Sequence, residues 1–509
     1  MQGHHPANYR IPLIITPSSL TPFVDRLPIP EILKPIGVAP SPLDIKMNLD
    51  LYQVEMNERE VKVHRDIQPT KIWSYGSSFP GPTFETRSGE GILVDWKNQL
   101  PTKHFLPVDR NLHGAEADKP EVRAVVHVHG AIVPPESDGY PEDWFVSGKS
   151  ARYYYPNRQE AAMLWYHDHT MGLERLNIYA GLFGAFFVRD AVEESLNLPS
   201  REYEVPLVLV DRMLDHEGQL YYPASMSDSG PWIPEFFGNL FLVNGKLLPY
   251  LEVEPRKYRF RVLNAANARF FRLTLPDGPT IHQIGTDQGL LPHPVEVKRL
   301  SLAPGERADL IVDFSEYAGH EIVMRNDVLP LMQLRVSAHK TADTSALPAA
   351  LRSIQQLDES KAVTTRMLTL NEYMDPYGHP TMMLLNGQRW HMPVTEKPIL
   401  NTVEIWSFVN LTSEVHPIHL HQARVQILDR QNFDALEYLR SEKIRYTGPR
   451  TSPEANETGW KDTVRVNGRT VTRIIVRFEG YPGRYLWHCH ILEHSAKEMM
   501  RPFDILAAD

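Results

Sequence analysis

The sequence of 509 residues contains a single cysteine, Cys489. One thiol excludes a disulfide within the chain, so packing and not covalent cross-linking must stabilise the fold. The thiol itself must be a buried small apolar group, a reactive group or a metal ligand. The residues around Cys489 therefore decide its role.

Long apolar runs are also missing. The longest nearly uninterrupted run covers the nine residues 180–188, whereas a helix needs roughly 20 apolar residues to cross a bilayer. The first residues, MQGHHPANYRIPLIITPSS, contain neither a sustained apolar core nor a paired-arginine motif of an export signal. We therefore expect cytoplasmic synthesis without a signal peptide, and no membrane segment.

Basic residues are in the minority. Lys and Arg total 53 against 63 Asp and Glu, which gives a formal net charge of −10. Without a basic excess to neutralise phosphates, nucleic acid is not an expected partner. Hydrophobic residues make up 42% and charged residues 23%, a composition that excludes disordered, collagen-like and coiled-coil chains. A globular chain of this length is expected to form about three domains.

Helical periodicity is scarce, whereas proline is abundant. The 42 prolines separate short β-branched and aromatic runs, as in all-β proteins with many strands. Apolar and polar residues alternate in residues 92–96, 258–263, 403–406 and 473–478. This alternation indicates antiparallel sheets with one solvent-exposed face. The predicted fold class is all-β.

The first and last thirds of the chain repeat one pattern. In both, an alternating run precedes a histidine pair, a loop and a Leu-Trp segment that leads into a second pair. The middle third has a Val-Asn-Gly segment at residues 243–245 that matches Leu-Asn-Gly at residues 385–387 of the last third. It lacks the histidine pairs. We predict three related β-domains with a linker before the last, at residues 1–195, 196–342, 343–365 (linker) and 366–509.

Histidine is concentrated at a few places. Ten of the 22 histidines fall in four clusters: His127 and His129; His167 and His169; His416, His419 and His421; and His488, His490 and His494. Residues i and i+2 of a strand point to the same face, so each H-x-H pair directs two imidazoles at one point. This spacing predicts metal binding. The other twelve histidines, His391 among them, receive no role.

Strand alternation separates these side chains into two pockets. Cys489 should point away from His488 and His490, and His416 can point away from the other histidines of its cluster. The first pocket would collect Cys489, His416 and His494, with Met499 available as a distant axial ligand. Two histidines, one cysteine and a weak, long methionine form the blue-copper arrangement, whereas zinc would not need the methionine.

The second pocket would collect the remaining eight imidazoles: His127, His129, His167, His169, His419, His421, His488 and His490. Eight are too many for one ion and too neutral for Ca²⁺ or Mg²⁺, so we expect about three transition-metal ions. Because the donors come from the first and last thirds, the site should lie between those domains.

Cys489 links the two pockets, because it is covalently adjacent to both His488 and His490. An electron accepted at the first pocket has a through-bond path to the second. A one-electron acceptor connected to a multi-electron store fits the reduction of O2 to water, which takes four electrons that four copper ions can supply. We therefore predict catalytic roles for Cys489, His488 and His490.

Segments from about Leu20 to the C-terminus, among them FPGPTFE, HVHGAIVPPESDGYPEDWF, LWYHDHTMG, HPIHLHQ and LWHCHILEH, resemble the three-domain multicopper oxidases. Within them, the chain is similar to bacterial laccases of the spore-coat protein A type. The resemblance implies cupredoxin-like domains, which are Greek-key β-sandwiches or barrels, and four copper ions. It assigns a type 1 copper to His416, Cys489, His494 and Met499; a type 2 copper to His127 and His419; and the type 3 pair to His129, His167 and His490 and to His169, His421 and His488.

The resemblance also bears on proton supply. Asp138 matches an acidic residue that the family places beside the type 2 copper. Many relatives carry a second acid directly after the histidine that matches His494, but here that residue is Ser495. Glu498 is acidic but sits at another position, and we predict a shifted or slower proton-coupled step. Met499 implies a lower type 1 potential than a non-coordinating residue would give.

The leading hypothesis is a laccase-type oxidase of phenols and aromatic amines, with O2 and small aromatic donors as partners, acting as a monomer. Within the enzyme class, the alternatives are a bilirubin oxidase and an o-aminophenol oxidase similar to phenoxazinone synthase. Outside it stands a structural spore-coat component, and the resemblance implies the outer spore coat as a location. A purely structural protein would not need the twelve ligands that this chain retains.

Overall fold

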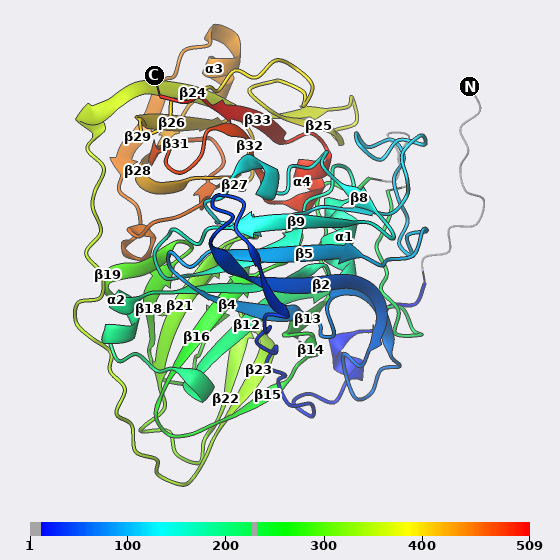
Figure 1. The fold of residues 1–509 in the computed structure, drawn as a ribbon, viewed down its shortest axis with the longest axis vertical. Coiled ribbons are helices and arrows are strands. Elements are labelled where there is room, and N and C mark those ends of the chain that lie inside the picture. The colour runs from blue at the N-terminus through cyan, green and yellow to red at the C-terminus, as the bar shows by residue number, and fades with distance from the viewer. Residues whose placement is uncertain (1–11, 226–231, 509) are drawn as a thin grey trace.

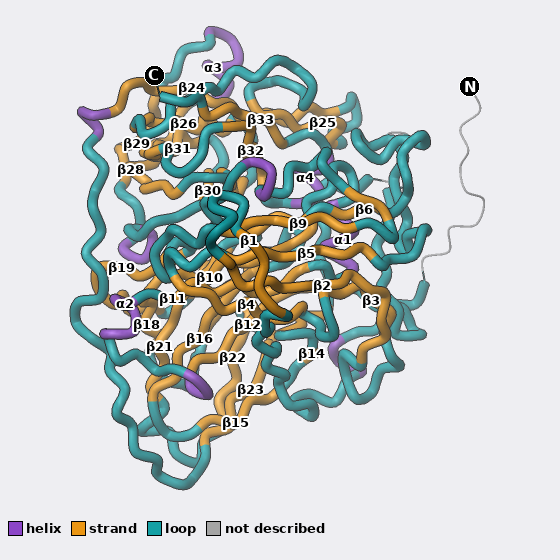
Figure 2. The backbone as a smooth tube through the Cα atoms, in the orientation of Figure 1, coloured by secondary structure: helices purple, strands orange, loops and turns teal. Residues whose placement is uncertain are grey.

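The computed structural model describes residues 12–225 and 232–508. Strands dominate these residues, while helices are few and short, as Figure 2 shows. The predicted all-β class is confirmed. In the view of Figure 1, the first third of the chain (blue to cyan) lies between the last third (yellow to red) and the middle third (green). No helix of the described ranges is long and apolar enough to cross a membrane.

The first third forms two sheets and a two-stranded ribbon of β6 and β8. One sheet has the order β1-β2-β5-β9, with β3 also paired to β2, and the other has the order β4-β11-β10-β7. The strands are β1 (Gly37–Pro40), β2 (Asn48–Val61), β3 (Thr70–Tyr75), β4 (Gly81–Arg87), β5 (Ile92–Asn98), β6 (Arg123–Ala124), β7 (Val126–His129), β8 (Phe145–Val146), β9 (Ser150–Tyr155), β10 (Ala162–Asp168) and β11 (Phe183–Arg189).

The middle third forms a seven-stranded sheet, β14-β13-β12-β16-β21-β18-β19, and a five-stranded sheet, β15-β23-β22-β17-β20. The strands are β12 (Glu204–Arg212), β13 (Leu240–Val243), β14 (Lys246–Leu247), β15 (Tyr250–Val253), β16 (Lys257–Asn264), β17 (Phe271–Thr274), β18 (Ile281–Thr286), β19 (Gly289–Val297), β20 (Leu300–Leu302), β21 (Arg307–Asp313), β22 (Glu321–Asn326) and β23 (Leu329–Val336).

The last third forms a six-stranded sheet, β25-β24-β26-β31-β28-β29, and a four-stranded sheet, β30-β27-β32-β33. The strands are β24 (Ala362–Met374), β25 (Pro380–Leu385), β26 (Val403–Asn410), β27 (His416–Leu420), β28 (Arg424–Phe433), β29 (Tyr446–Thr451), β30 (Thr463–Val466), β31 (Thr470–Arg477), β32 (Gly483–Cys489) and β33 (Met500–Ile505).

Short helices connect some of these strands. The α-helices are α1 (Glu174–Ala180), α2 (Ala191–Ser195), α3 (Ala435–Ser441) and α4 (Leu492–Ala496). The 3₁₀ turns are η1 (Pro17–Ser19), η2 (Pro135–Ser137), η3 (Arg201–Tyr203), η4 (Glu359–Lys361) and η5 (Ala455–Glu457). Helices α1 and α4 pack against each other, although more than 300 residues separate them in the sequence. This contact joins the segments that follow two of the histidine pairs.

One strand arrangement occurs three times. In each third, a long strand pairs in parallel with a later strand of its sheet: β2 with β5, β12 with β16, and β24 with β26. The later strand then pairs in antiparallel fashion with β9, β21 and β31, respectively. The repeat inferred from the sequence is therefore visible in the strand order, including the middle third that lacks the histidine pairs.

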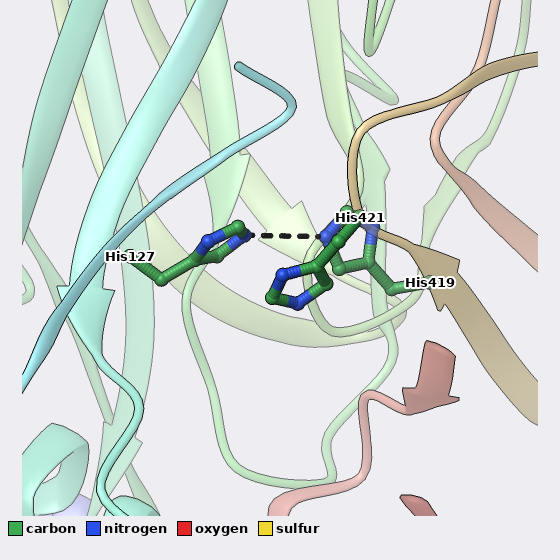
Figure 3. Close-up of side chains that lie close together, drawn as sticks. All are labelled: His127, His419 and His421. Atoms are coloured by element: carbon green, nitrogen blue, oxygen red, sulfur yellow. Dashed lines mark hydrogen bonds between the residues drawn. The ribbon is translucent and has the colours of Figure 1, made fainter. Parts of the chain in front are cut away.

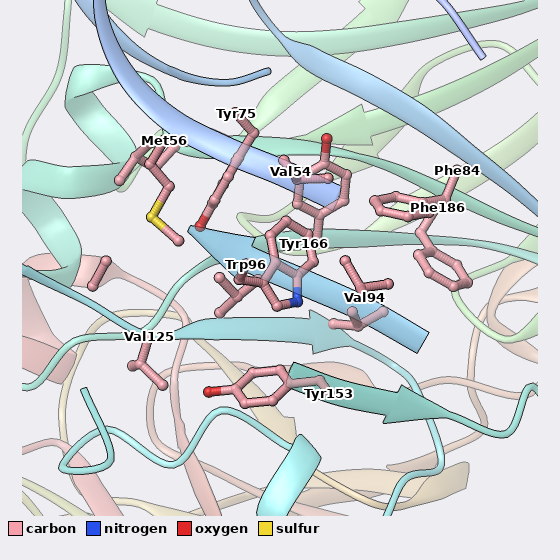
Figure 4. Close-up of a cluster of buried hydrophobic side chains, with 14 of the residues drawn as sticks. Val54, Met56, Tyr75, Phe84, Val94, Trp96, Val125, Tyr153, Tyr166 and Phe186 are labelled. Carbon is pink, nitrogen blue, oxygen red and sulfur yellow. The ribbon is translucent and has the colours of Figure 1, made fainter. Parts of the chain in front are cut away.

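Each pair of sheets encloses an apolar core. In the first third, Phe84, Trp96 and Tyr166 meet between the sheets (Figure 4), and the rings of Phe84 and Tyr166 pack edge to face with centroids 5.4 Å apart. Equivalent cores surround Phe260 in the middle third and Trp406 in the last third. Burying one such Phe stabilises the fold by about 1.5–3 kcal/mol, so each third holds its sheets together without cross-links.

Candidate metal centres

Four strands bring the clustered histidines together between the first and last thirds. Strands β7 and β10 carry three of the four in the first third, and β27 and β32 carry three of the six in the last. The others are His169, His421 and His490, each directly after one of these strands, and His494 on α4. Antiparallel register places His167 opposite His127, and His419 opposite His488, so the rings of each pair share one face. All ten clustered histidines are buried. They form the two groups described below.

The first group consists of His416, Cys489 and His494. The Sγ atom of Cys489 lies 3.6 Å from Nδ1 of His416 and 3.6 Å from Nδ1 of His494, and the two nitrogens are 3.2 Å apart. The hydroxyl of Thr412 contacts the other ring nitrogen of His416, Nε2, at 2.8 Å and orients that ring. Three donor atoms that converge in this way could hold one metal ion.

The chain after Cys489 turns back to bring Met499 beside it. Helix α4 presents His494, and Glu498 then takes the left-handed conformation, with φ 72°. The returning backbone places the carbonyl of Met499 3.0 Å from the N–H of Cys489, which donates to it. Met499 is fully buried in the same apolar cluster as Cys489. The local fold thus brings the predicted axial residue to the first group.

The second group contains the other eight histidines, and in it ring nitrogens face each other. Nε2 of His127 lies 3.5 Å from Nε2 of His419 (Figure 3). The Nδ1–H of His127 donates to the carbonyl of Asp138 at 2.7 Å, and that of His419 donates to the carbonyl of Asp462 at 2.9 Å. In a neutral imidazole whose Nδ1 carries the hydrogen, Nε2 holds a lone pair. Two lone pairs aimed at each other need a cation between them.

The same geometry recurs on the other side of the group. Nε2 of His169 lies 3.3 Å from Nε2 of His488, whose Nδ1–H donates to the carbonyl of Cys489 at 3.1 Å. Further buried ring nitrogens have no hydrogen-bond partner in the described part of the chain: Nδ1 of His129, Nε2 of His167, Nε2 of His421 and both nitrogens of His490. These unpaired ring nitrogens are suited to bind metal ions, because buried polar atoms are otherwise hydrogen-bonded.

Burial keeps these imidazoles available as ligands. It lowers the pKa of His416 and of His488 to about 3. Burial and the neighbouring imidazoles together lower the pKa values of seven more of the clustered histidines far below the usual value. These are His129, His167, His169, His419, His421, His490 and His494. Neutral imidazole is the form that binds a metal.

Comparison with known proteins identifies the family to which this chain belongs. Two family models described as multicopper oxidase match residues 117–193 and 360–509. The chain is 46% identical to a laccase of Bacillus subtilis (strain 168), over 96% of this chain and 99% of that one, and 46% identical to a laccase of Bacillus stratosphericus, over 96% and 100%. A solved laccase from Pediococcus acidilactici superposes with a TM-score of 0.78 at 28% identity, covering 96% of this chain and 95% of that one. The chain belongs to the multicopper oxidase family.

This membership confirms several of the predictions. The cupredoxin-like fold, the laccase-type oxidoreductase function with O2 as the electron acceptor, and the four-copper cofactor follow from the close relatives. Nothing in the comparisons favours a bilirubin oxidase, an o-aminophenol oxidase or a structural protein.

Asp138 joins a histidine of the first third to a histidine of the last third within the second group. Its backbone carbonyl accepts from His127, and its Oδ2 accepts from the Nδ1–H of His421 at 2.8 Å. Its other oxygen, Oδ1, is buried without a hydrogen-bond partner in the described ranges. The carboxylate that the sequence singled out therefore lies against the eight histidines.

Glu498 lies elsewhere. Its Oε2 accepts from the backbone N–H of Trp390 at 3.1 Å, and its Oε1 lies 3.9 Å from Nη1 of Arg389. Ser495 instead donates to Oε2 of Glu174 at 3.1 Å. Glu174 and Ser495 thus meet where helices α1 and α4 pack together.

Glu174 is a buried carboxyl that the sequence analysis missed. Its Oε1 lies 3.8 Å from Nε2 of His169 and has no hydrogen-bond partner in the described part of the chain. Burial raises the pKa of Glu174 to about 8. The signal available in the sequence was an acid five residues after His169, at the start of a segment that is otherwise mostly apolar.

Asp462 is the second missed residue. Its Oδ1 accepts from the Nε2–H of His129 at 2.9 Å, which leaves Nδ1 of His129 as the free nitrogen. Its carboxylate is held by Arg307 of the middle third. No spacing in the sequence indicates this contact, because 333 positions separate His129 from Asp462.

Proposed function

We propose that this multicopper oxidase takes single electrons from small phenols and aromatic amines at His416, Cys489, His494 and Met499, and delivers them to O2 at the eight-histidine group. The observation that carries the proposal is the position of Cys489. Its thiol faces His416 and His494, while its chain neighbours His488 and His490 belong to the second group. Three consecutive residues thus connect the two groups through covalent bonds.

Bound copper would supply the reversible one-electron chemistry at the first group and the four-electron reduction of O2 at the second. For the type 1 ion we assign His416, Cys489, His494 and Met499; for the type 2 ion His127 and His419; and for the type 3 pair His129, His167 and His490 together with His169, His421 and His488. The facing nitrogens of His127 and His419 support the second assignment. The convergence of His169, His421 and His488 within reach of one ion supports the last.

Protons must also reach the second group, because reduction of one O2 to two waters consumes four of them. Asp138 and Glu174 each direct an unpaired buried oxygen, Oδ1 and Oε1, near its histidines. We propose that these oxygens hold and pass on protons. Glu174 takes this role in preference to Glu498, whose carboxylate contacts residues 389 and 390.

We propose that electrons from the donor enter the first group through the ring of His494. Nε2 of His416 is occupied by Thr412, whereas Nε2 of His494 has no hydrogen-bond partner in the described residues. Transfer of a single electron requires contact and a suitable potential and not a dedicated acid or base, so the class of small aromatic donors stays broad.

The organisation of the molecule is part of the proposal. We infer three domains at residues 1–195, 196–342 and 366–509 with a linker at 343–365, and this division is supported by the apolar cluster between the two sheets of each third. We further propose a monomer that is located in the outer spore coat, a location that the resemblance to spore-coat laccases supports. Light scattering of the copper-loaded protein and fractionation of spores test these two statements.

An absorption spectrum of the copper-loaded protein tests the central assignment. We expect an intense red band from the Cys489 thiolate and a near-ultraviolet shoulder from the paired ions, both bleached by a phenol and restored by air. Cys489→Ser should lose the red band and phenol oxidation while keeping copper at the eight-histidine group. A fully loaded, oxidised parent protein without the red band would overturn the assignment of Cys489.

A further inference from the structure

Three side chains outside the two groups meet at the junction of the first and last thirds. His113 and Glu142 belong to loops of the first third, and His391 belongs to the loop between β25 and β26 of the last. One ligand atom from each lies within 4.8 Å of the others. The rings of His113 and His391 approach edge to face, with centroids 4.4 Å apart. None of these residues takes part in the proposed oxidase chemistry.

The ring of His113 is held in the orientation of a metal ligand. Its Nδ1 lies 3.2 Å from Oε1 of Glu116, and the N–H of Gly114 donates to the same oxygen at 3.0 Å, which fixes the carboxylate. A carboxylate that accepts from one ring nitrogen leaves the lone pair on the other. That other nitrogen, Nε2, is buried and has no hydrogen-bond partner in the described part of the chain.

We propose that His113, Glu142 and His391 form a fifth metal site, which binds a divalent transition-metal ion such as Zn²⁺. Two imidazoles and one carboxylate are a recurrent ligand set for zinc, with water completing the coordination. The same donors exclude Ca²⁺ and Mg²⁺ as preferred ions, because these favour all-oxygen sites. Glu116 is the positioning residue that orients His113.

The surroundings indicate what the ion does. Trp390, the residue before His391, belongs to a small apolar cluster formed by both thirds: Tyr140, Met171, Trp390, Leu486 and Met500. Arg501 donates to the carbonyls of Trp390 and Pro393, at 3.1 and 2.7 Å, and so fixes the loop that carries His391. An ion held by His113 and His391 would therefore fasten the first third to the last. It would stabilise the junction without entering the electron path.

Zinc binding to the copper-loaded enzyme tests this site. Zn²⁺ is redox-silent and binds N/O sites less tightly than Cu²⁺, so it should leave the four copper ions in place. After equilibrium dialysis near neutral pH, elemental analysis should find one more bound zinc ion per chain in the parent than in His391→Ala. Saturating zinc should raise the melting temperature of the parent and leave that of His391→Ala unchanged. Glu116→Gln should weaken the binding of this ion by about 10- to 100-fold.

The controls separate the site from general effects. His216→Ala removes an exposed histidine of the middle third and should bind zinc as the parent does. Each variant must retain four copper ions and the red absorption; if His391→Ala does not, Glu142→Gln takes its place. Equal zinc stoichiometry and affinity in the parent and in the variant that removes a ligand, or no zinc binding by the parent, would overturn the proposal.

Discussion

Arg307 of the middle third holds the carboxylate of Asp462 of the last third with two hydrogen bonds. Nη1 lies 2.7 Å from Oδ1 and Nη2 lies 2.5 Å from Oδ2, and both side chains are buried. The same Oδ1 accepts from the Nε2–H of His129, in the first third. A carboxylate that orients a metal-binding histidine raises its affinity for the metal. The middle third, which carries no proposed ligand, thus contributes to the second group through Arg307.

The first prediction concerns this carboxylate. Asp462→Asn should lower the affinity of the second group for copper by about 10- to 100-fold, because His129 loses its charged partner. After dialysis against a chelator, the copper content should fall below four per chain, while the red absorption of the first group remains.

A matched control separates positioning from stability. Asp309 forms a similar buried pair with Arg259, at 2.8 and 2.5 Å, and no contact between it and the clustered histidines is found in the described residues. Asp309→Asn should keep its copper. Equal copper loss in both variants would show that Asp462 acts only through stability.

The second prediction concerns the carboxyl beside His169. Glu174→Ser should slow the oxidation of the fully reduced enzyme by O2 by about 100-fold, the lower end of what a positioned proton donor contributes. Because Ser495 donates directly to Glu174, the double variant Glu174→Ser, Ser495→Glu returns a carboxyl to the same place. Stopped-flow reoxidation should show recovery in the double variant.

Glu498 provides the comparison for Glu174. Glu498→Gln should leave the reoxidation rate within a few-fold of the parent, since its carboxylate contacts Trp390 and Arg389. Slow reoxidation in Glu498→Gln together with a normal rate in Glu174→Ser would reverse the assignment of the two acids.

Residues related by short spacing could be predicted from the sequence. The i, i+2 pairs on β7 and at the end of β32 point to one face because a strand repeats every two residues. The same rule turns Cys489 away from His488 and His490, as the contact of its thiol with His416 shows. The fold class followed from the same period.

Residues that act through distant contacts could not be predicted. The pairing of His129 with Asp462 depends on how the first and last thirds dock, and Arg307 enters from the middle third. Glu174 meets Ser495 only because α1 packs on α4. Such contacts follow from tertiary packing, which no local period encodes.

The third prediction concerns a buried ion cluster between the first and middle thirds. Glu204 accepts from Arg189 and from Arg261, each at 2.8 Å. Burial alone would raise the pKa of Glu204, but Arg259, Arg189 and Arg261 together lower it to about 2. In the unfolded chain the pKa of a Glu is about 4.3. The ionised carboxylate therefore stabilises the fold above that pH, and its contribution is lost as the pH falls from about 5 towards about 2.

Glu204→Gln should lower the free energy of unfolding by about 3 kcal/mol at pH 7, at about 1.4 kcal/mol per pKa unit. The difference from the parent should shrink as the pH falls through this range, as measured by urea unfolding of the copper-loaded proteins. Glu217→Gln, at an exposed side chain, should change stability little at any pH. A loss in Glu204→Gln that did not depend on pH would indicate that packing, and not charge, accounts for the role of Glu204.

The fourth prediction separates two neighbouring buried methionines. Met499→Leu removes the proposed axial thioether but nearly conserves volume, so the stability should change by less than about 1.5 kcal/mol. The type 1 potential should rise, because the oxidised ion loses a donor. Met500 is equally buried but packs in the apolar cluster with Tyr140 and Trp390, so Met500→Leu should leave the potential unchanged. A redox titration that follows the red band measures both variants. Equal potentials in Met499→Leu and the parent would mean that Met499 only fills space beside Cys489.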